Sequence, residues 1–199
     1  MSHSTKNAIG TIPSLRLLIF CAHFRSGHKN LSSYSAYQNI KMTEIHIRPA
    51  RLDELATLIS FEQGIVAAER PFDPTLKAGE IHYYDIGALI DSPEAEVVVA
   101  VAGDELVGSG YIRREVSKDF RTHDFHGYIG FMYVKPTYRG QGISKLVLDA
   151  LIAWGHAHDL QEFQLEVYAD NEAAVRAYTK AGFSSHLVRM RLESRTNNP

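Results

Sequence analysis

The sequence contains a single cysteine, Cys21, among 199 residues. One thiol cannot form an internal disulfide, and it cannot supply the set of thiolates that a structural metal requires. Residues 42–199 contain no cysteine at all. A domain formed by this part of the chain therefore cannot use a mechanism that depends on a cysteine nucleophile.

Long apolar runs and an excess of one charge are also missing. The longest fully apolar runs, residues 17–22 and 97–102, contain six residues each, whereas a membrane-spanning helix needs about 20 such residues. The net charge is -2 and the pI is about 6.5, and Lys and Arg are scattered along the chain. Such a protein has no general field that attracts nucleic acid or anionic lipid. We therefore expect no membrane or nucleic-acid partner and a cytoplasmic location.

Residues 1–41 differ in composition from the remainder of the chain. They are rich in Ser, Asn, Lys and His, and they show no sustained hydrophobic period. We interpret them as a disordered leader or a wrongly assigned start, and residues 42–199 as one domain. The alternatives are a targeting peptide, because no acidic residue precedes Glu44, and a secretory signal, which His23 and Arg25 after the apolar stretch disfavour.

Strand-like and helix-like patterns alternate from residue 44 onward. Apolar residues at every second position indicate a strand, and apolar residues three or four positions apart indicate a helix. The predicted strands cover residues 45–49, 97–101, 106–112, 128–134 and 163–168 and a pair within 183–192; the predicted helices cover residues 52–59, 76–90 and 142–158 and a segment from Asn171 to Gly182. Helices inserted between strands predict an α/β fold with a mixed sheet that is covered on both faces.

The most informative segment is residues 134–144, which leave a predicted strand, make a glycine-containing turn and enter a helix. Glycine lets the main chain approach a ligand closely, and the first amides of a helix have no intrahelical acceptor. The segment could therefore bind a pyrophosphate, although a helix start that binds nothing has the same pattern. It contains neither Gly-x-Gly-x-x-Gly nor the Gly-Lys-Ser/Thr of a P-loop.

Two motifs resemble those of the GCN5-related N-acetyltransferases. Residues 139–144, Arg-Gly-Gln-Gly-Ile-Ser, are similar to motif A of that superfamily, with Ser144 in place of its last Gly or Ala, and residues 165–183 are similar to its motif B. The likeness extends over about residues 45–192. It implies the acyl-CoA N-acyltransferase fold, with a mixed, mostly antiparallel sheet, and acetyl-CoA as the cofactor and acetyl donor.

The resemblance also implies a cofactor site. In this family, main-chain groups before motif A bind the pantetheine, amides of motif A bind the pyrophosphate, and an Asn and a Tyr of motif B complete the site. Carried over to this sequence, the cofactor-binding residues are Met132, Tyr133, Val134, Arg139, Gly140, Gln141, Gly142, Ile143, Ser144, Asn171 and Tyr178. As alternatives, Asn171 could serve only as a helix cap and Tyr178 only as a core aromatic.

The implied reaction is direct attack of a primary amine on acetyl-CoA in a ternary complex. The amide of Val134 or a neighbour would stabilise the oxyanion, and Tyr178 would protonate the departing thiolate. Many relatives carry a carboxylate as base where this sequence has Gly130. Glu166 is the replacement that we select, although a strand carboxylate in a salt bridge would have the same pattern.

The acceptor of the acetyl group is harder to predict. The early helices border this site in the family, so the candidate wall residues are Glu62, Glu69, Arg70, Phe72, His82, Tyr83 and Tyr84. Carboxylates and aromatic rings would suit a cationic amine, which could belong to a small molecule, a peptide or a protein. The chain could also form a homodimer. His123, Asp124 and His126 lack a metal-ligand pattern, so we expect no metal. The competing function is a noncatalytic acyl-CoA sensor or interaction module with the same fold.

Overall fold

The computed structural model describes residues 44–192. The elements are β1 (Ile45–Pro49), η1 (Leu52–Glu54), α1 (Leu55–Glu69), α2 (Ile86–Asp91), β2 (Ala95–Ala102), β3 (Glu105–Val116), β4 (Phe125–Val134), η2 (Pro136–Tyr138), α3 (Ile143–Ala157), β5 (Phe163–Gln164) and α4 (Glu172–Lys180). Chain contacts divide them into two compact units, one ending at Glu166 and the other beginning at Val167. The prediction for residues 1–41 lies outside the described residues.

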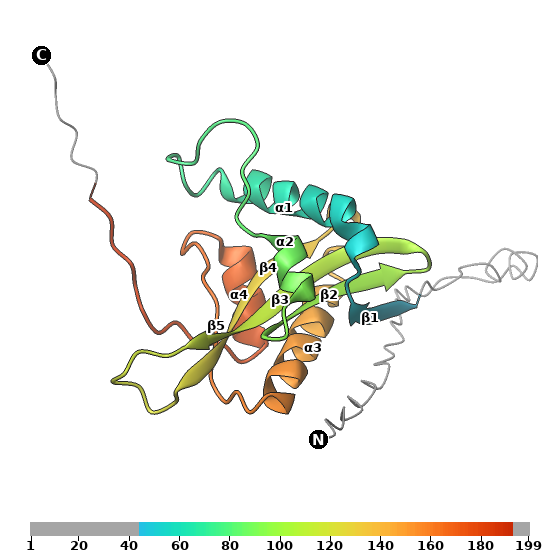
Figure 1. Cartoon of the computed structure of the whole chain (residues 1–199). Helices are drawn as coiled ribbons and strands as arrows, with labels where there is room; N and C mark the ends of the chain where they lie inside the picture. Colours follow the sequence, from blue (N-terminus) through green and yellow to red (C-terminus); the bar gives the residue numbers. More distant parts are fainter. Residues whose placement is uncertain (1–43, 193–199) are drawn as a thin grey trace, which may run out of the picture. The chain divides into compact units, whose positions relative to one another are not determined.

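The first unit is built on one five-stranded sheet in the order β1-β2-β3-β4-β5, which Figure 1 shows as a twisted ribbon. The first four strands are antiparallel neighbours, and β5 pairs parallel to β4. The sheet is therefore mixed and mostly antiparallel, which confirms the predicted fold class. The β2–β3 hairpin appears as predicted because the run Val97–Val101 and the turn at Gly103 both favour it.

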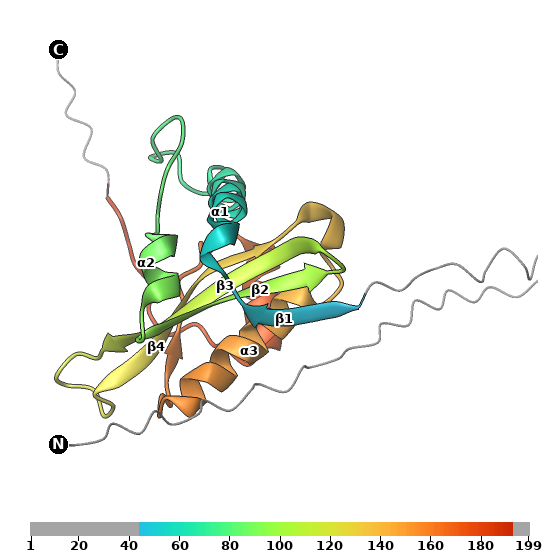
Figure 2. The ribbon, with the colours of Figure 1, turned by 45° about the vertical axis from the view of Figure 1, so that its right-hand side comes forward.

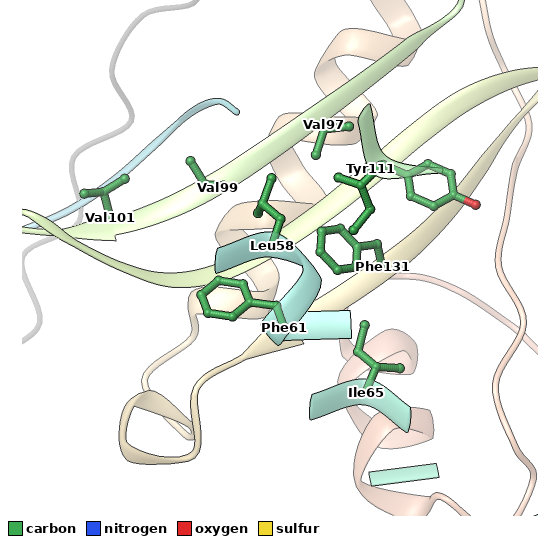
Figure 3. Close-up of a cluster of buried hydrophobic side chains, with 9 residues drawn as sticks. Leu58, Phe61, Ile65, Val97, Val99, Val101, Tyr111 and Phe131 are labelled. Atoms are coloured by element: carbon green, nitrogen blue, oxygen red, sulfur yellow. The ribbon is translucent and has the colours of Figure 1, made fainter. Parts of the chain in front are cut away.

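Helices cover both faces of this sheet, with α1 and α2 on one face and α3 on the other (Figure 2). The strand residues alternate accordingly. Val97, Val99 and Val101 pack against Leu58 and Phe61 of α1 (Figure 3), whereas Gly108 lies beside Ala100 of β2 and Ile143 of α3. Because both sides of β2 are buried, this strand is apolar along nearly its whole length.

The predicted helix over residues 76–90 is wrong for its first ten residues, since α2 begins only at Ile86. The cause lies in Gln63 of α1 and in Arg70, which follows α1, because their side chains bind the main chain of the connecting segment. Arg70 donates to the carbonyls of Lys77 and Gly79, and the Gln63 side-chain amide bonds both main-chain groups of Ile81. These bonds satisfy the backbone polar groups that a helix would have paired internally.

Two predicted strands near the end of the chain are also shorter or missing. The predicted strand 163–168 is reduced to β5, Phe163–Gln164, which pairs with β4 at Gly127 and Tyr128. Residues 183–192 contain no assigned strand. Apolar alternation shows that a segment can form a strand, but a strand also needs a partner edge, and the alternation does not encode one.

The second unit contains α4, and its ends match the predicted caps. The Asn171 side chain accepts a hydrogen bond from the Ala174 amide at 3.2 Å, which makes Asn171 the N-cap. Gly182, just past the helix, has φ 101°, a left-handed conformation that favours glycine. The local sequence was sufficient to place both ends of this helix.

Candidate active site

A bulge interrupts β4 at the centre of the first unit. Tyr111 pairs with Gly130, and Ser109 pairs with Tyr133, so that two β4 residues oppose Gly110. Phe131, the first of the two, has φ 56°. Its amide donates to the Tyr84 hydroxyl at 3.4 Å, and its carbonyl accepts from the Ser109 hydroxyl at 3.2 Å. Side chains from two other segments therefore fix this break in the ladder.

Beyond the bulge, β4 presents main-chain groups on the side away from β3. The Lys135 amide donates to the Val107 carbonyl at 2.8 Å, and hydrogen-bonded and non-hydrogen-bonded pairs alternate along an antiparallel ladder. Val134, opposite Gly108, therefore directs its own main-chain groups away from β3. Its carbonyl accepts from Arg139 Nε at 3.1 Å. Since the pairing of β5 with β4 lies back at Gly127 and Tyr128, this edge of β4 is a place where an extended ligand could add as a strand.

The chain leaves this edge directly into a turn that ends at α3. Gly140 has φ 75° and Gly142, the N-cap of α3, has φ 79°. The amides of Lys145 and Leu146 donate to the Gly142 carbonyl, so the amides of Ile143 and Ser144 lie before the first intrahelical hydrogen bonds. Such amides form the positive end of the helix dipole and bind anions. The predicted succession of strand, turn and helix is therefore present.

Glu105, which the sequence interpretation missed, ties this turn to the β2–β3 hairpin. Its carboxylate accepts from Lys135 Nζ at 2.7 Å and from the Tyr138 hydroxyl at 2.8 Å. These two hydrogen bonds lower the pKa of Glu105, and the bond to Glu105 raises the pKa of Tyr138. The partners are about 30 residues apart in the sequence, so no local pattern indicates the contact.

On the other side of the bulge, Glu62 organises the segment between α1 and α2. Its carboxylate is fully buried, with 0% of the side chain exposed. One oxygen accepts from the amides of Tyr83 and Tyr84 at 2.7 and 2.9 Å. The other oxygen lies 2.8 Å from His82 Nδ1. Glu62 thereby sets the direction in which the two tyrosine side chains leave the main chain.

The Tyr84 ring fills the space between this segment and the bulge. It meets Tyr83, Tyr111 and Phe131 edge to face, with centroid distances of 5.9, 5.3 and 5.7 Å. Burial raises the pKa of Tyr84 to about 12. Its hydroxyl therefore keeps its proton at neutral pH and is a hydrogen-bond donor.

Glu69, the last residue of α1, is half-buried. Burial raises the pKa of its carboxyl group, and the interaction with the Tyr83 hydroxyl acts in the opposite direction with a smaller effect. A carboxyl group with a raised pKa next to aromatic rings is a common feature of acid-base sites.

Tyr111 explains why this sequence carries glycine at position 130. A Cβ atom at Gly130 would lie 2.8 Å from ring carbons of Tyr111 and 2.9 Å from its hydroxyl oxygen. Tyr111 is itself buried, with 1% of its surface exposed, so it cannot move aside at low cost. A carboxylate side chain, such as the resemblance leads one to expect at this position, has no room here.

Comparison with known proteins identifies the family. The model of the acetyltransferase (GNAT) family matches residues 61–183, which is more than half of the chain. The chain belongs to the acetyltransferase (GNAT) family. Among curated GNAT relatives, N-alpha-acetyltransferase 30 of Schizosaccharomyces pombe is 33% identical over 85 residues, which cover 43% of this chain and 55% of the relative. N-alpha-acetyltransferase 30 of Saccharomyces cerevisiae is 39% identical over 57 residues, which cover 29% and 32%. The chain thus spans about half and about a third of these two proteins.

Solved structures support the GNAT fold. A Bacillus halodurans protein solved as a tetramutant has a TM-score of 0.66 at 24% identity, and the match covers 74% of this chain and 99% of that chain. A predicted acetyltransferase from Clostridium acetobutylicum, solved with acetyl-CoA, has a TM-score of 0.59 at 19% identity and covers 75% and 96%. At these identities the likeness concerns the fold.

Several predicted wall residues of this GNAT domain come together. Glu62, His82, Tyr83 and Tyr84 are joined by the contacts above, and the last three line an open pocket of about 450 Å³ beside Leu55 and Ile59 of α1. Arg70 binds main-chain carbonyls, and Phe72 is half-buried in the turn after α1. Their role in binding an acceptor stays a prediction.

The two predicted catalytic residues, Glu166 and Tyr178, belong to different units. Glu166 is exposed and lies just beyond the end of β5, in the first unit. Tyr178 lies in the second unit, on α4, where its ring meets Phe183 edge to face at 6.2 Å. Asn171 caps the same helix. Their roles in cofactor binding and catalysis stay predictions.

Residues considered for a metal have other partners. His126 is buried, and its Nδ1 lies 3.1 Å from the Ser117 hydroxyl. Within residues 44–192, no group of three or more His, Cys, Asp or Glu side chains is placed to hold a metal ion. Nor does any helix in that range combine the length and the apolar character that crossing a membrane requires.

Proposed function

We propose that this GNAT protein transfers an acetyl group from acetyl-CoA to a primary amine by direct attack in a ternary complex. The observation that carries the proposal is the continuity of the β4 edge at Val134 with the turn and the start of α3. The edge suits the amides of pantetheine, and the helix amides suit a pyrophosphate. The structural relative solved with acetyl-CoA supports this use of the fold.

In this proposal, main-chain groups of residues 132–134 and 139–144 hold the cofactor, and Asn171 and Tyr178 have the roles that the resemblance implies. The Val134 amide would face the thioester and stabilise the oxyanion. Tyr178 would protonate the thiolate that leaves. The reaction requires no metal ion in this scheme, and we keep the cytoplasm as the proposed location.

The acceptor that we propose is the α-amine of a polypeptide. Two curated relatives are named as N-alpha-acetyltransferases, and their matches support an acceptor of that class. Chemistry favours it as well. An α-amine has a pKa near 8 and a lysine side chain one near 10.4, so far more of the α-amine is neutral at pH 7.

Acetyl-CoA binding tests the cofactor site. Gly142→Ala would put a side chain at φ 79° and disturb the amides that begin α3, so we expect a loss of acetyl-CoA affinity in calorimetry. Gly79→Ala is the matched control, because Gly79 has φ 84° and, like Gly142, open space around its Cβ position. Both variants carry a similar conformational cost of about 1–2 kcal/mol. Equal affinity in the two variants would contradict the proposed site.

Kinetics test the direct attack. Initial rates measured against acetyl-CoA and a peptide amide with a free α-amine should give intersecting double-reciprocal lines. Parallel lines would instead indicate a covalent acetyl-enzyme and a ping-pong mechanism. If the protein binds acetyl-CoA but releases no thiol with any amine, the proposed function is wrong and the protein is a noncatalytic acyl-CoA-binding module.

A further inference from the structure

The pocket beside α1 contains a histidine whose ring is held by a buried carboxylate. His82 lines this pocket of about 450 Å³, and 55% of its side chain is exposed. Its Nδ1 lies 2.8 Å from Oε2 of Glu62, whose side chain is 0% exposed. The other Glu62 oxygen accepts from the amides of Tyr83 and Tyr84. Because these amides fix the carboxylate, Glu62 in turn fixes the imidazole.

The contact with Glu62 also determines which ring nitrogen of His82 carries the proton. A carboxylate can only accept a hydrogen bond, so Nδ1 must be the donor. In a neutral imidazole the second nitrogen, Nε2, then has a free lone pair. Oε1 of Glu80 lies 3.7 Å from Nε2, which is too far for a hydrogen bond. Glu62 therefore presents Nε2 of His82 as a proton acceptor.

The same pocket extends to the bulge in β4 through Tyr84. Tyr84 lines the pocket together with His82, and its hydroxyl lies 3.4 Å from the Phe131 amide. Phe131 precedes Val134 on the strand whose edge is proposed to hold the pantetheine. An acceptor that fills this pocket would therefore contact both His82 and the tyrosine that meets the bulge.

The other polar groups of the pocket are less suited to take a proton. Tyr84 has a pKa of about 12 and keeps its proton at neutral pH. Asp85 accepts from the Ala88 amide as the N-cap of α2. The charged and titratable groups around His82 are Glu62 of α1, Glu80, Tyr83 and Tyr84 of the connecting segment, and Asp85 at the start of α2.

We propose that His82 is the catalytic base that takes a proton from the ammonium group of the acceptor, and that Glu62 is the residue that positions it. The inference rests on the proposed function and deepens it. His82 takes the role for which the sequence suggested Glu166, which lies exposed beyond β5. His82 and Glu62 were predicted only as wall residues of the acceptor site.

The proposed step conserves atoms and charge. Nε2 of His82 takes one proton from the ammonium, directly or through one water, and the exposed ring passes it to solvent. The lone pair of the neutral amine then attacks the thioester carbonyl carbon and forms the N–C bond, and a second proton leaves nitrogen for water. The C–S bond breaks, its electron pair leaves with sulfur, and the thiolate takes a proton from the general acid or from water.

The test uses His82→Gln, Glu62→Gln and the double variant. Glutamine at position 82 cannot take the proton. Glutamine at position 62 still accepts from the two amides, but its NH₂ group donates to Nδ1, which moves the imidazole proton to Nε2 and removes the lone pair there. His46→Gln is the matched control, because His46 is an exposed histidine that also lies 3.7 Å from a glutamate carboxylate. The measurement is kcat/KM for a peptide amide with a free α-amine at saturating acetyl-CoA, from pH 6.5 to 9.5.

The expected size of the effect follows from the acceptor. An α-amine with a pKa near 8 is only about one-tenth neutral at pH 7, and a protein without the base can use only that fraction. We therefore expect His82→Gln and Glu62→Gln each to lower kcat/KM about tenfold at pH 7 and to reach the parent value near pH 9.5, where the amine is neutral. The double variant should lose no more than either single variant, because both changes remove the same base. His46→Gln and the acetyl-CoA affinity of every variant should match the parent.

Three results would overturn the inference while the proposed function remains. Parent-like kcat/KM in His82→Gln at pH 7, or a loss that is equal at pH 7 and pH 9.5, would make His82 only a wall residue of the pocket. A loss in His82→Gln without one in Glu62→Gln would overturn the positioning role of Glu62.

Failure of the proposed function has a different signature. A parent protein that binds acetyl-CoA but acetylates none of an α-amine peptide, a lysine peptide and spermidine would overturn the proposed function, and the base role with it. The two failures are distinguishable because the second involves no variant.

Discussion

Substitutions of Glu62 test what fixes the segment between α1 and α2, which lines the pocket proposed for the acceptor. Glu62→Ala would remove the acceptor of the Tyr83 and Tyr84 amides, which now donate to a single carboxylate oxygen. A buried donor left without a partner costs about 1–3 kcal/mol. Both amides would lose their acceptor, and water entering the space left by the side chain would offset a part of the combined cost. We therefore expect a loss of about 3 kcal/mol in the free energy of unfolding.

Glu62→Gln separates the hydrogen bonds from the charge. The glutamine oxygen can still accept from both amides, and its NH₂ group can donate to His82 Nδ1 when the imidazole is neutral. Because the side chain of His82 is 55% exposed, the change in its contact with residue 62 should matter little. We expect a loss of about 1 kcal/mol or less for Glu62→Gln and no change for the exposed control Glu80→Gln.

Urea denaturation monitored by circular dichroism measures these differences, and for a chain of this size 1 kcal/mol shifts the melting temperature by about 2–4 °C. Glu62→Ala should therefore melt about 6–12 °C below the parent, and it should also lose acetyl transfer because Tyr84 is no longer held at the bulge. If Glu62→Ala and Glu62→Gln unfold at the same urea concentration, the two amides do not depend on Glu62 and the reasoning fails.

Three further predictions concern other parts of the fold. Gly64→Ala should lower the melting temperature although alanine favours helix, because its Cβ would lie 2.5 Å from the Tyr133 ring and overpacking costs about 1–3 kcal/mol; an unchanged melting temperature would show that the ring can move. The hydrogen bond from Arg48 is the main cause that lowers the pKa of Glu54, so its stabilising effect is present above the unfolded value near 4.3 and is lost as pH falls through the folded pKa. Glu54→Gln should therefore be less stable than the parent at pH 7 and equal to it in strong acid, and a gap in urea midpoint that persists in strong acid would contradict this cause. Tyr178→Phe should lower the single-turnover rate by about 10²-fold without changing acetyl-CoA affinity, and a parent-like rate would make Tyr178 a packing residue.

The parts of the fold that could be predicted are those that depend on neighbouring residues. The turn from Arg139 to Ser144 and the start of α3 follow from glycine placement and apolar spacing over a few residues. The caps of α4 follow from Asn171 and Gly182 for the same reason. Each of these features is encoded within one or two helical turns.

The parts that could not be predicted depend on residues far apart in the sequence. The connection after α1 is shaped by Glu62, whose partners lie about 20 residues later. Tyr111 and Gly130 exclude a carboxylate from β4 only because their two strands are neighbours. Helical spacing at residues 76–85 was therefore a true local preference that tertiary hydrogen bonds overrode.

The bulge in β4 determines on which face of the sheet each later residue of this strand lies. Before the bulge Tyr128 lies with Tyr111 on the α1 side, and after it Phe131 and Tyr133 lie on that side, so the even-numbered and odd-numbered positions exchange faces. Removing one of the two residues that oppose Gly110 would restore a continuous ladder and leave every later side chain on its present face, whereas a continuous ladder that kept both residues would turn the later side chains to the opposite face. In a comparison with a distant sequence that lacks the bulge, an alignment without a one-residue gap between residues 130 and 133 would therefore assign each following position to the wrong face of the sheet.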